Sequence, residues 1–468
     1  MQYDFGMIGL GTMGRNFLLN VADRGYAAAG LDLNADQVAS LNEEAGHRKI
    51  QATTDQSEFL QMLKTPRTIM LLVPAGKVVD AVIEGLLPHL DQGDLIIDGG
   101  NSHYADTSRR AEALQSQGFR FLGVGVSGGE EGARKGPSIM PGGDFSAWEQ
   151  VQPILEAVSA KVDREPCVAY MGKGAAGHYV KMVHNGIEYG MMQLLAETYD
   201  MLRRIGGFTN AEIHETFSEW NKGPLQSFLV EITAEIFAQA DDKIEGADLI
   251  DAILDKAKQK GTGKWTSQTA MDLGVPVPTI DAAVTMRGLS SFWRFRQTAA
   301  QKYGSFPTER IENKETFAVQ LEHALLFSFI LTYAQGLHLL SVASEEMDLD
   351  LRLSDTAKIW RGGCIIRAEL LEDIRQAYAG NPDLANLVGS PVFRGRLKTL
   401  LPSVRAVVET ATQNGIPLLA LSSALHYFEA LRAARLPLNL VQAQRDYFGA
   451  HTYERLDADG TFHTEWGK

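Results

Sequence analysis

The first 175 residues alternate short apolar runs with segments in which apolar residues recur at helical spacing. Such runs have the length of buried strands, and strands that alternate with helices build βαβ units around a parallel sheet. We therefore predict an α/β domain with a largely parallel sheet. Its predicted strands are Tyr3–Ile8, Ala27–Leu31, Thr68–Val73, Leu95–Asp98 and Phe119–Gly123.

From about residue 177 to residue 435 the strand pattern nearly disappears and long helical patterns dominate. The two most apolar predicted helices span residues 177–204 and 316–344. After Pro437 the chain becomes polar. The pattern predicts three parts: an α/β domain over residues 1–176, a large all-α domain over 177–435 and a C-terminal tail over 436–468.

The first of these helices carries a polar stripe at spacings i, i+3, i+4 and i+7, which share one helix face. The stripe consists of Lys181, His184, Asn185 and Glu188. An ordinary solvated face is the alternative reading, but the helix is apolar almost all round and is expected to be buried. Gly186 and Gly190 each cost roughly 1 kcal/mol relative to alanine in a helix, which favours close approach of a ligand or another backbone. The stripe is a candidate site.

A glycine-rich turn directly follows the first predicted strand. It consists of Gly9, Leu10, Gly11, Thr12, Met13 and Gly14, and a helical pattern begins at Arg15. Asp32 stands at the end of the second strand, 18 residues after Gly14. A GxGxxG turn between a strand and a helix, followed by such an acidic residue, is typical of a Rossmann-like dinucleotide-binding domain.

Asp32 also indicates which dinucleotide is bound. A carboxylate at this position accepts hydrogen bonds from both ribose hydroxyls and repels a 2′-phosphate. Leu33 and Asn34 follow, and the first basic side chains downstream begin at His47. We expect NAD to be preferred, with NADP possible.

Two further glycine-rich segments, Asp98–Ser102 and Val126–Gly132, are predicted to follow strands. Ligands of open α/β sheets bind beyond the carboxyl ends of the strands. Alone, either segment is an ordinary turn; together with the first turn they outline a cleft.

The composition excludes several classes of function and site. The net charge of −14 argues against a general nucleic-acid or membrane-surface binder, so basic residues for an anionic substrate must gather in one pocket. Cys167 and Cys364 form no CxxC motif, and neither a disulfide framework nor a cysteine metal site is expected. The N-terminus has no basic segment typical of a signal peptide, and the apolar run 324–334 is too short to span a bilayer. We expect a cytoplasmic protein.

Several long segments resemble decarboxylating 6-phosphogluconate dehydrogenase in its long, two-domain form. They are Ile97–Ser102, Gly125–Gly143, Lys181–Gly190, Lys260–Thr266, Arg361–Arg367 and Arg445–Tyr453. The resemblance implies a homodimer whose tail reaches into the partner subunit. It also implies the reaction, in which 6-phosphogluconate and a nicotinamide cofactor give ribulose 5-phosphate, carbon dioxide and reduced cofactor.

The resemblance assigns roles to residues of this chain. Lys181 would be the general base and then a proton donor to the enolate, Glu188 the general acid at C1, and no metal would be needed. Cofactor contacts would extend to Val73, Pro74, Ala75 and Asn101. The sugar acid would be held by Asn101, Ser127, Gly128, Gly129, His184 and Asn185, and its phosphate by Tyr189, Lys260, Thr262 and Arg287 with Arg445 and His451 of the partner.

The chain departs from the family pattern near the cofactor. Members that use NADP commonly carry Asn-Arg-Thr where this chain has Asp32-Leu33-Asn34, and Pro74 replaces a frequent lysine. Met191 replaces a frequent aspartate after the stripe. Two alternatives stay open: another β-hydroxyacid dehydrogenase acting on an unphosphorylated acid, and a non-catalytic NAD-binding protein.

Overall fold

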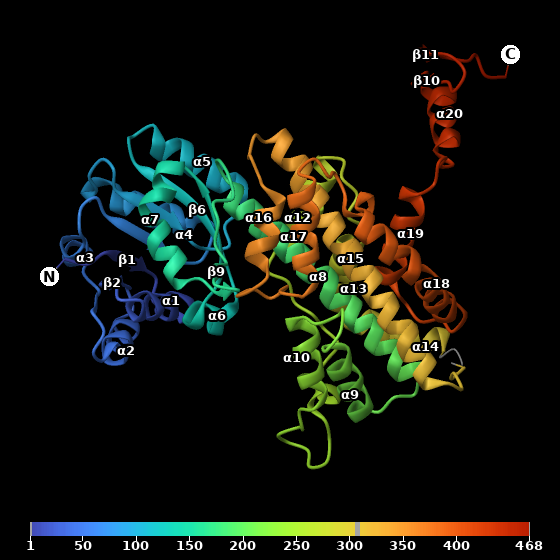
Figure 1. Ribbon diagram of the computed structural model, residues 1–468, viewed down its shortest axis with the longest axis horizontal. Coiled ribbons are helices and arrows are strands. Elements are labelled where there is room, and N and C mark those ends of the chain that lie inside the picture. Colours follow the sequence, from blue (N-terminus) through green and yellow to red (C-terminus); the bar gives the residue numbers. More distant parts are fainter. Residues whose placement is uncertain (1, 305–308, 468) are drawn as a thin grey trace.

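A computed structural model describes residues 2–304 and 309–467. Figure 1 shows an α/β domain (blue to cyan) beside a larger helical domain (green to red), from which the C-terminal segment projects. This confirms the predicted fold class.

A seven-stranded sheet in the order β3-β2-β1-β4-β5-β6-β7 forms the first domain. Its strands are β1 (Phe5–Ile8), β2 (Ala28–Leu31), β3 (Ile50–Thr53), β4 (Thr68–Leu71), β5 (Leu95–Asp98), β6 (Arg120–Ser127) and β7 (Ser138–Gly143). The pairs are parallel except β6 with β7, so the prediction of a largely parallel sheet is correct.

Two strands escaped the prediction, each for a physical reason. The edge strand β3 buries only its last two residues and therefore has no apolar run. The strand β7 contains Pro141 and two glycines, which are typical of a turn. Strand β6 continues to Ser127, so Val126 and Ser127, predicted to lie in a loop, end this strand.

Helices cover both faces of the sheet and bury two apolar clusters against it. They are α1 (Thr12–Asp23), α2 (Ala35–Ala45), α3 (Gln56–Met62), α4 (Lys77–Leu86), the short 3-10 turn Leu87–His89, α5 (Tyr104–Gln115), α6 (Gly129–Lys135) and α7 (Phe145–Val158). A short hairpin, β8 (Lys161–Val162) with β9 (Glu165–Pro166), leads toward the helical domain.

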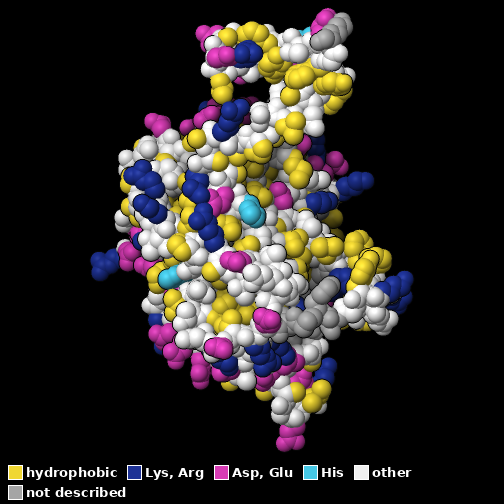
Figure 2. Space-filling model, turned by 90° about the vertical axis from the view of Figure 1, so that its right-hand side faces the viewer, with side chains coloured by type: hydrophobic (Ala, Val, Ile, Leu, Met, Phe, Trp, Pro, Cys, Tyr) yellow, Lys and Arg dark blue, Asp and Glu magenta, His cyan; other side chains and the backbone are white. Residues whose placement is uncertain are grey.

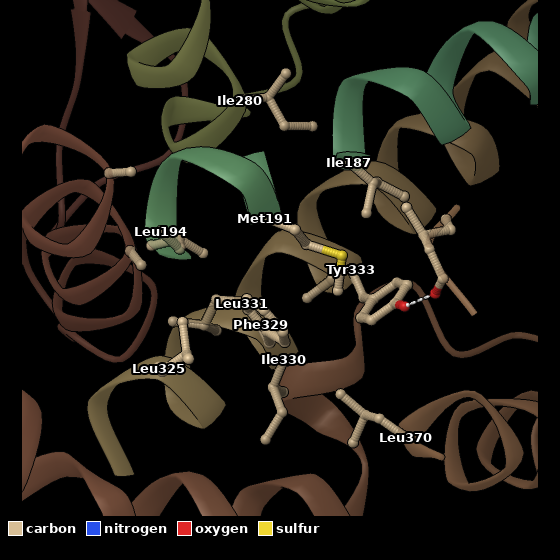
Figure 3. Close-up of a cluster of buried hydrophobic side chains, with 14 of the residues drawn as sticks. Ile187, Met191, Leu194, Ile280, Leu325, Phe329, Ile330, Leu331, Tyr333 and Leu370 are labelled. Carbon is tan, nitrogen blue, oxygen red and sulfur yellow. Dashed lines mark hydrogen bonds between the residues drawn. The ribbon is translucent and has the colours of Figure 1, made fainter. Parts of the chain in front are cut away.

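Two long helices, α8 (Ala176–Arg204) and α15 (Lys314–Glu346), form the centre of the helical domain and match the two predicted apolar helices closely. Figure 3 shows Ile187, Met191 and Leu194 of α8 facing side chains of α15. Met191 is buried in this cluster, which suits its apolar side chain. Helix α15 has the length and hydropathy of a membrane span, but 83% of its most apolar window is buried in the protein, so it is a core helix.

Most of the other helices contribute side chains to the core around this pair, whereas α14 contributes none. The helices are α9 (Asn210–Trp220), α10 (Phe228–Phe237), α11 (Leu249–Ala252), α12 (Thr262–Asp272), α13 (Pro278–Ser291), α14 (Trp293–Tyr303), α16 (Leu353–Trp360), α17 (Leu370–Gly380), the 3-10 turn Leu387–Gly389, α18 (Pro391–Gln413) and α19 (Leu419–Leu431).

The tail consists of α20 (Leu438–Gly449) and a hairpin of β10 (Tyr453–Glu454) with β11 (Thr461–Phe462). The buried carboxylate of Asp446 ties these pieces together. It accepts hydrogen bonds from the backbone N–H groups of Thr452 and Thr464 and from the side chains of His463 and Trp466. The tail is therefore a small folded unit.

The start of α8 lies directly against strands β6 and β7. A Cβ atom on Gly177 would overlap backbone atoms of Gly123, Met140 and Gly142, and one on Gly125 would overlap the Lys181 side chain. Glycines on both sides therefore bring the helix within backbone contact of the sheet. This docking places the stripe of α8 beyond the carboxyl ends of the strands.

Candidate active site

The glycine-rich turn has the geometry of a dinucleotide cradle. Gly9 has φ +95°, and a Cβ atom there would lie 2.5 Å from the carbonyl oxygen of Leu72. Gly14 packs against the Gly9 carbonyl, which lets α1 begin close behind the turn. At Gly11 a Cβ atom would meet nothing within 4 Å. The open side of the turn, at the N-terminus of α1, can therefore receive a pyrophosphate.

Asp32 is fixed beside this turn by two backbone groups. Its carboxylate accepts hydrogen bonds from the Leu10 N–H at 2.7 Å and the Asn34 N–H at 2.9 Å. The Asn34 side chain in turn caps α2 through the Asp36 N–H, and Leu33 is 94% exposed. A carboxylate held at this position is available to ribose hydroxyls.

A buried arginine joins two loops of the cleft, and sequence reasoning missed it. Arg110 donates to the Asp98 carboxylate at 3.1 Å and to the carbonyl of Gly76, which follows the predicted cofactor segment 73–75. Asp98 also accepts from the Gly100 N–H and the Ser102 hydroxyl. The loop that carries Asn101 is thus held from both ends, while Asn101 itself is exposed.

Lys181 and His184 of the stripe are buried and Asn185 and Glu188 are partly buried, so the alternative of a solvated polar face is wrong. Lys181 is 6% exposed and His184 is fully buried. Lys181 Nζ lies 2.8 Å from Asn185 Oδ1 and 3.5 Å from His184 Nδ1. His184 Nε2 lies 3.3 Å from the Ser127 hydroxyl, and Glu188 Oε2 lies 3.9 Å from His184 Nδ1.

Burial adjusts the ionisation of these groups. It lowers the pKa of Lys181, although the neighbouring Glu188 opposes the shift. It raises the pKa of Glu188 against the opposing charges of Lys181 and Arg287. Burial, with Lys181 adding to it, also lowers the pKa of His184 well below its usual value. Burial therefore moves Lys181 and His184 toward their neutral forms and Glu188 toward its protonated form.

The mid-helix glycines accommodate side chains of neighbouring helices. A Cβ atom on Gly186 would lie 2.6 Å from the Thr266 side chain of α12, and one on Gly190 would lie 2.7 Å from the Thr332 side chain of α15. The expected close approach is confirmed, but the partners are threonine side chains rather than a backbone.

Helices α12 and α13 bring further predicted residues to the stripe. Asn185 Nδ2 donates to the Thr262 hydroxyl at 3.2 Å. The Arg287 guanidinium lies over the Tyr189 ring, 3.4 Å from its centroid. Lys260 is exposed just before α12. Trp360, which sequence reasoning missed, packs edge-on against His184.

The substrate loop is held by the helical domain. Gly128 has φ +118°, and a Cβ atom there would lie 2.5 Å from the carbonyl oxygen of Gly363. That carbonyl also accepts a hydrogen bond from the Ser138 N–H. The segment Arg361–Arg367 thus supports Ser127, Gly128 and Gly129 from behind.

Arg445 and His451 do not reach the stripe within one chain. Both belong to the projecting tail and are exposed, and Figure 1 shows α20 far from the start of α8. Among the described residues there is no group of three or more His, Cys, Asp or Glu side chains that could hold a metal ion.

Comparison with known proteins identifies the family. Residues 4–172 match the model of the NAD binding domain of 6-phosphogluconate dehydrogenase, and residues 177–466 match that of the 6-phosphogluconate dehydrogenase C-terminal domain. The chain belongs to the 6-phosphogluconate dehydrogenase family.

Relatives match along the whole chain. The NADP(+)-dependent, decarboxylating 6-phosphogluconate dehydrogenase of Bacillus subtilis is 50% identical and covers 100% of both chains. The decarboxylating enzyme of Escherichia coli is 49% identical over 99% of both chains. The solved 6-phosphogluconate dehydrogenase of Plasmodium falciparum has a TM-score of 0.96 at 43% identity, covering 99% of this chain and 100% of that one.

These matches establish the activity. The chain is a decarboxylating 6-phosphogluconate dehydrogenase, an NAD(P)-dependent oxidoreductase that binds 6-phosphogluconate and decarboxylates it oxidatively. The predicted enzyme class is confirmed, and the alternatives of an unphosphorylated substrate or a non-catalytic role fall away.

Proposed function

We propose that Lys181 is the base for oxidation at C3 of 6-phosphogluconate and that Glu188 protonates C1 after decarboxylation. The supporting observation is that two groups of complementary charge are buried on one helix stripe, with the pKa of the amine lowered and that of the carboxyl raised. Each group is thereby available in the form that its step requires.

The first step needs a neutral amine. Lys181 takes the proton of the C3 hydroxyl as hydride leaves C3, and the bound nicotinamide supplies the hydride acceptor. Asn185, which accepts from Nζ at 2.8 Å, orients the amine. After oxidation the protonated Lys181 donates a hydrogen bond to the oxygen on which negative charge develops as carbon dioxide leaves.

The last step needs a carboxyl group that still holds its proton. Glu188, whose pKa is raised by burial, gives that proton to C1 of the enediol. We propose that Asn101, Ser127, Gly128, Gly129 and His184 hold the carboxylate and hydroxyls of the sugar acid. Neutral His184, which contacts the Ser127 hydroxyl, orients the substrate without adding charge.

The phosphate end lies further along α8. Tyr189, Thr262 and Arg287 lie beside the stripe and Lys260 lies just before Thr262. A guanidinium stacked on an aromatic ring is held in one orientation and offers its N–H donors to a phosphate. We propose that these four residues hold the phosphate together with Arg445 and His451 of the partner subunit.

Lys181→Ala tests the catalytic assignment. Loss of a general base is expected to lower kcat by about 10²- to 10⁴-fold, because no other buried amine stands at this point. Dinucleotide affinity, measured by fluorescence titration, should stay near that of the parent. Lys173→Ala, which removes an exposed lysine paired with Asp348, is the control. Normal turnover of Lys181→Ala contradicts the assignment.

We propose that NAD is the preferred cofactor. Asp32, held by the Leu10 and Asn34 N–H groups, presents its carboxylate where a 2′-phosphate would lie, and the next side chain, Leu33, offers no positive charge. The Bacillus subtilis relative is NADP(+)-dependent and the Plasmodium falciparum enzyme was solved with NADP+, so this preference would distinguish the chain from them.

Initial rates of NAD and NADP reduction with 6-phosphogluconate measure this preference directly. The double variant Asp32→Asn, Leu33→Arg removes the repelling charge and adds a phosphate-binding one, so it should move the kcat/KM ratio toward NADP. A parent enzyme that reduces NADP more efficiently would refute the role given to Asp32.

We propose that the enzyme works as a homodimer with exchanged tails. Each chain is divided into an α/β domain over residues 1–176, a helical domain over 177–435 and a tail over 436–468. A groove of about 700 Å³ borders Arg287. Its apolar lining includes Met192, Leu195, Ile236, Ile253, Leu254 and Leu289. The tail exposes Leu438, Leu440, Val441, Tyr447 and Phe448, and Figure 2 shows hydrophobic side chains gathered on it. Exposed apolar patches on both parts favour association.

Mixing two inactive variants tests the exchange. In a heterodimer of Lys181→Ala with Arg445→Ala, one active site has an intact Lys181 and receives an intact Arg445 from the other subunit. Co-refolded mixtures should therefore regain activity that neither variant has alone. If Arg445 serves its own subunit, mixing restores nothing.

We also infer a cytoplasmic location. Cys167 and Cys364 are both free and buried, which suits a reducing compartment. Cell fractionation with an antibody against the chain would test the inference.

A further inference from the structure

His178 joins the two domains one turn before Lys181 on α8. It is 1% exposed, and its Nδ1 lies 2.7 Å from the Thr107 hydroxyl of α5. Its Nε2 is buried and has no hydrogen-bond partner in the part of the chain that the structure describes. Buried polar atoms without a partner are rare, so the nearest polar groups are the candidates to bind this nitrogen.

The unpartnered side of the ring faces the loop that carries Asn101. The backbone groups of Asp98 and Gly100 lie near enough to the imidazole to favour its charged form by hydrogen bonding, and the Asp98 carboxylate and the Arg110 guanidinium are its charged neighbours. Burial lowers the pKa of His178, and Arg110 adds to this while Asp98 opposes it. The ring is therefore neutral and carries one hydrogen.

The position of that hydrogen follows from Thr107. Its hydroxyl lies 2.7 Å from His178 Nδ1 and 3.2 Å from the His103 carbonyl oxygen, and it has one hydrogen to give. The shorter contact assigns that hydrogen to Nδ1, which accepts it. The imidazole hydrogen then resides on Nε2, and this N–H is directed at the carbonyl groups of the loop.

The helix that carries His178 has no freedom to move toward the loop. Gly177 packs against the backbone of strands β6 and β7, and a Cβ atom on Gly123 would lie 3.0 Å from His178 Nδ1. The loop on the other side of the ring ends in the exposed Asn101. His178 therefore stands between a fixed helix and the loop that carries Asn101.

We propose that His178 is a positioning residue whose Nε2–H binds a backbone carbonyl group of Asp98 or Gly100. The bond fixes Asn101 at a set distance from Lys181, three residues further along the same helix. This inference rests on the proposed role of Asn101 between cofactor and substrate. Since Arg110 already holds the other side of Asp98, the loop is then fixed between the two domains.

Two amide variants separate the two nitrogens of His178. The amide nitrogen of glutamine reaches the place of Nε2, whereas the amide oxygen of asparagine reaches the place of Nδ1 and accepts from Thr107. His178→Gln keeps the donor toward the loop and should retain most of kcat. His178→Asn keeps only the Thr107 contact and should lose about tenfold or more in kcat, because misplacement near the reacting atoms is costly.

A kinetic isotope effect, which does not depend on folding stability, completes the test. With 6-phosphogluconate deuterated at C3, the isotope effect on kcat should rise in His178→Asn, since hydride transfer becomes slower relative to product release. Thr107→Val, which removes only the hydroxyl, should lower the melting temperature and leave the isotope effect unchanged.

Three outcomes would overturn the inference. They are equal kcat in the two amide variants, a larger loss in His178→Gln, and an unchanged isotope effect in His178→Asn. The comparison is made with Lys181 intact, so it stays separate from the test of the base, which depends on Lys181→Ala alone.

Discussion

Gly186→Ala is the substitution whose effect follows most directly from the packing of α8. The added Cβ atom would lie 2.6, 2.7 and 2.8 Å from three atoms of the Thr266 side chain. Thr266 is itself held by hydrogen bonds to the carbonyl groups of Met182 and Thr262, so it cannot rotate freely away. Helix α12 must therefore move, by about 0.8 Å if an ordinary contact of 3.4 Å is restored.

That displacement acts on the substrate side of the cleft. The hydrogen bond from Asn185 to Thr262 is already 3.2 Å long and would exceed hydrogen-bonding distance. Losing it and shifting the phosphate end should lower kcat/KM for 6-phosphogluconate by about ten- to a hundredfold. Overpacking should also cost about 1–3 kcal/mol of folding stability.

Steady-state kinetics at saturating dinucleotide and thermal unfolding measure these two effects. Gly190→Ala is the matched control, because its Cβ atom would lie 2.7 Å from Thr332 of α15, a helix that carries none of the proposed substrate contacts. The control should lose comparable stability with little change in KM for 6-phosphogluconate. Unchanged kcat/KM in Gly186→Ala, or equal kinetic losses in both variants, would refute the reasoning.

Three further outcomes are expected. Gly11→Ala should fold normally and weaken dinucleotide binding in a fluorescence titration, because its Cβ atom meets no protein atom; Gly14→Ala should unfold the turn instead. In the pH profile of kcat, Lys181 must be neutral and Glu188 protonated, so activity rises with pH on the acid limb and falls on the alkaline limb. The two limbs belong to the coupled pair. Glu188→Gln removes the group that must hold a proton, so its residual activity should rise with pH and then level off without an alkaline limb. Desolvation would raise the pKa of Asp446, but hydrogen bonds from the tail hold it well below the usual value of 3.8. This stabilisation is present above that value and is lost as the pH falls below it, and Asp446→Asn should cause the same loss at neutral pH, seen as faster proteolysis of the tail.

Local sequence patterns were enough to predict much of the secondary structure and the local motifs of this protein. Strand-and-helix alternation predicted the α/β domain, and periodicity located α8 and α15 to within two residues at each end. The GxGxxG turn could be predicted to bind a dinucleotide, because its glycines act within a few residues of one another. The stripe was also predictable, since a helix places residues three and four apart on one face whatever surrounds it.

Contacts between residues far apart in the chain could not be predicted from local patterns. Glu188 and Glu197 are both carboxyl groups on α8 whose pKa is raised by burial, and the sequence does not say which residues each of them meets. In the fold, Glu188 faces Lys181, whereas Glu197 accepts the N–H groups of Ala420 and Leu421 and so caps α19. Burial raises the pKa of Glu197 to about 7, but its role is structural.

The same limit applies to Arg110 and His178, whose neighbours come from separate strands and helices. Sequence alone fixed which chemical groups are present and which share a helix face, because those relations are local. Only the tertiary structure decided which of them are buried together, because burial depends on elements that meet across more than a hundred residues of chain. It is this packing that shifts the pKa of Lys181 and Glu188 in opposite directions on one stripe.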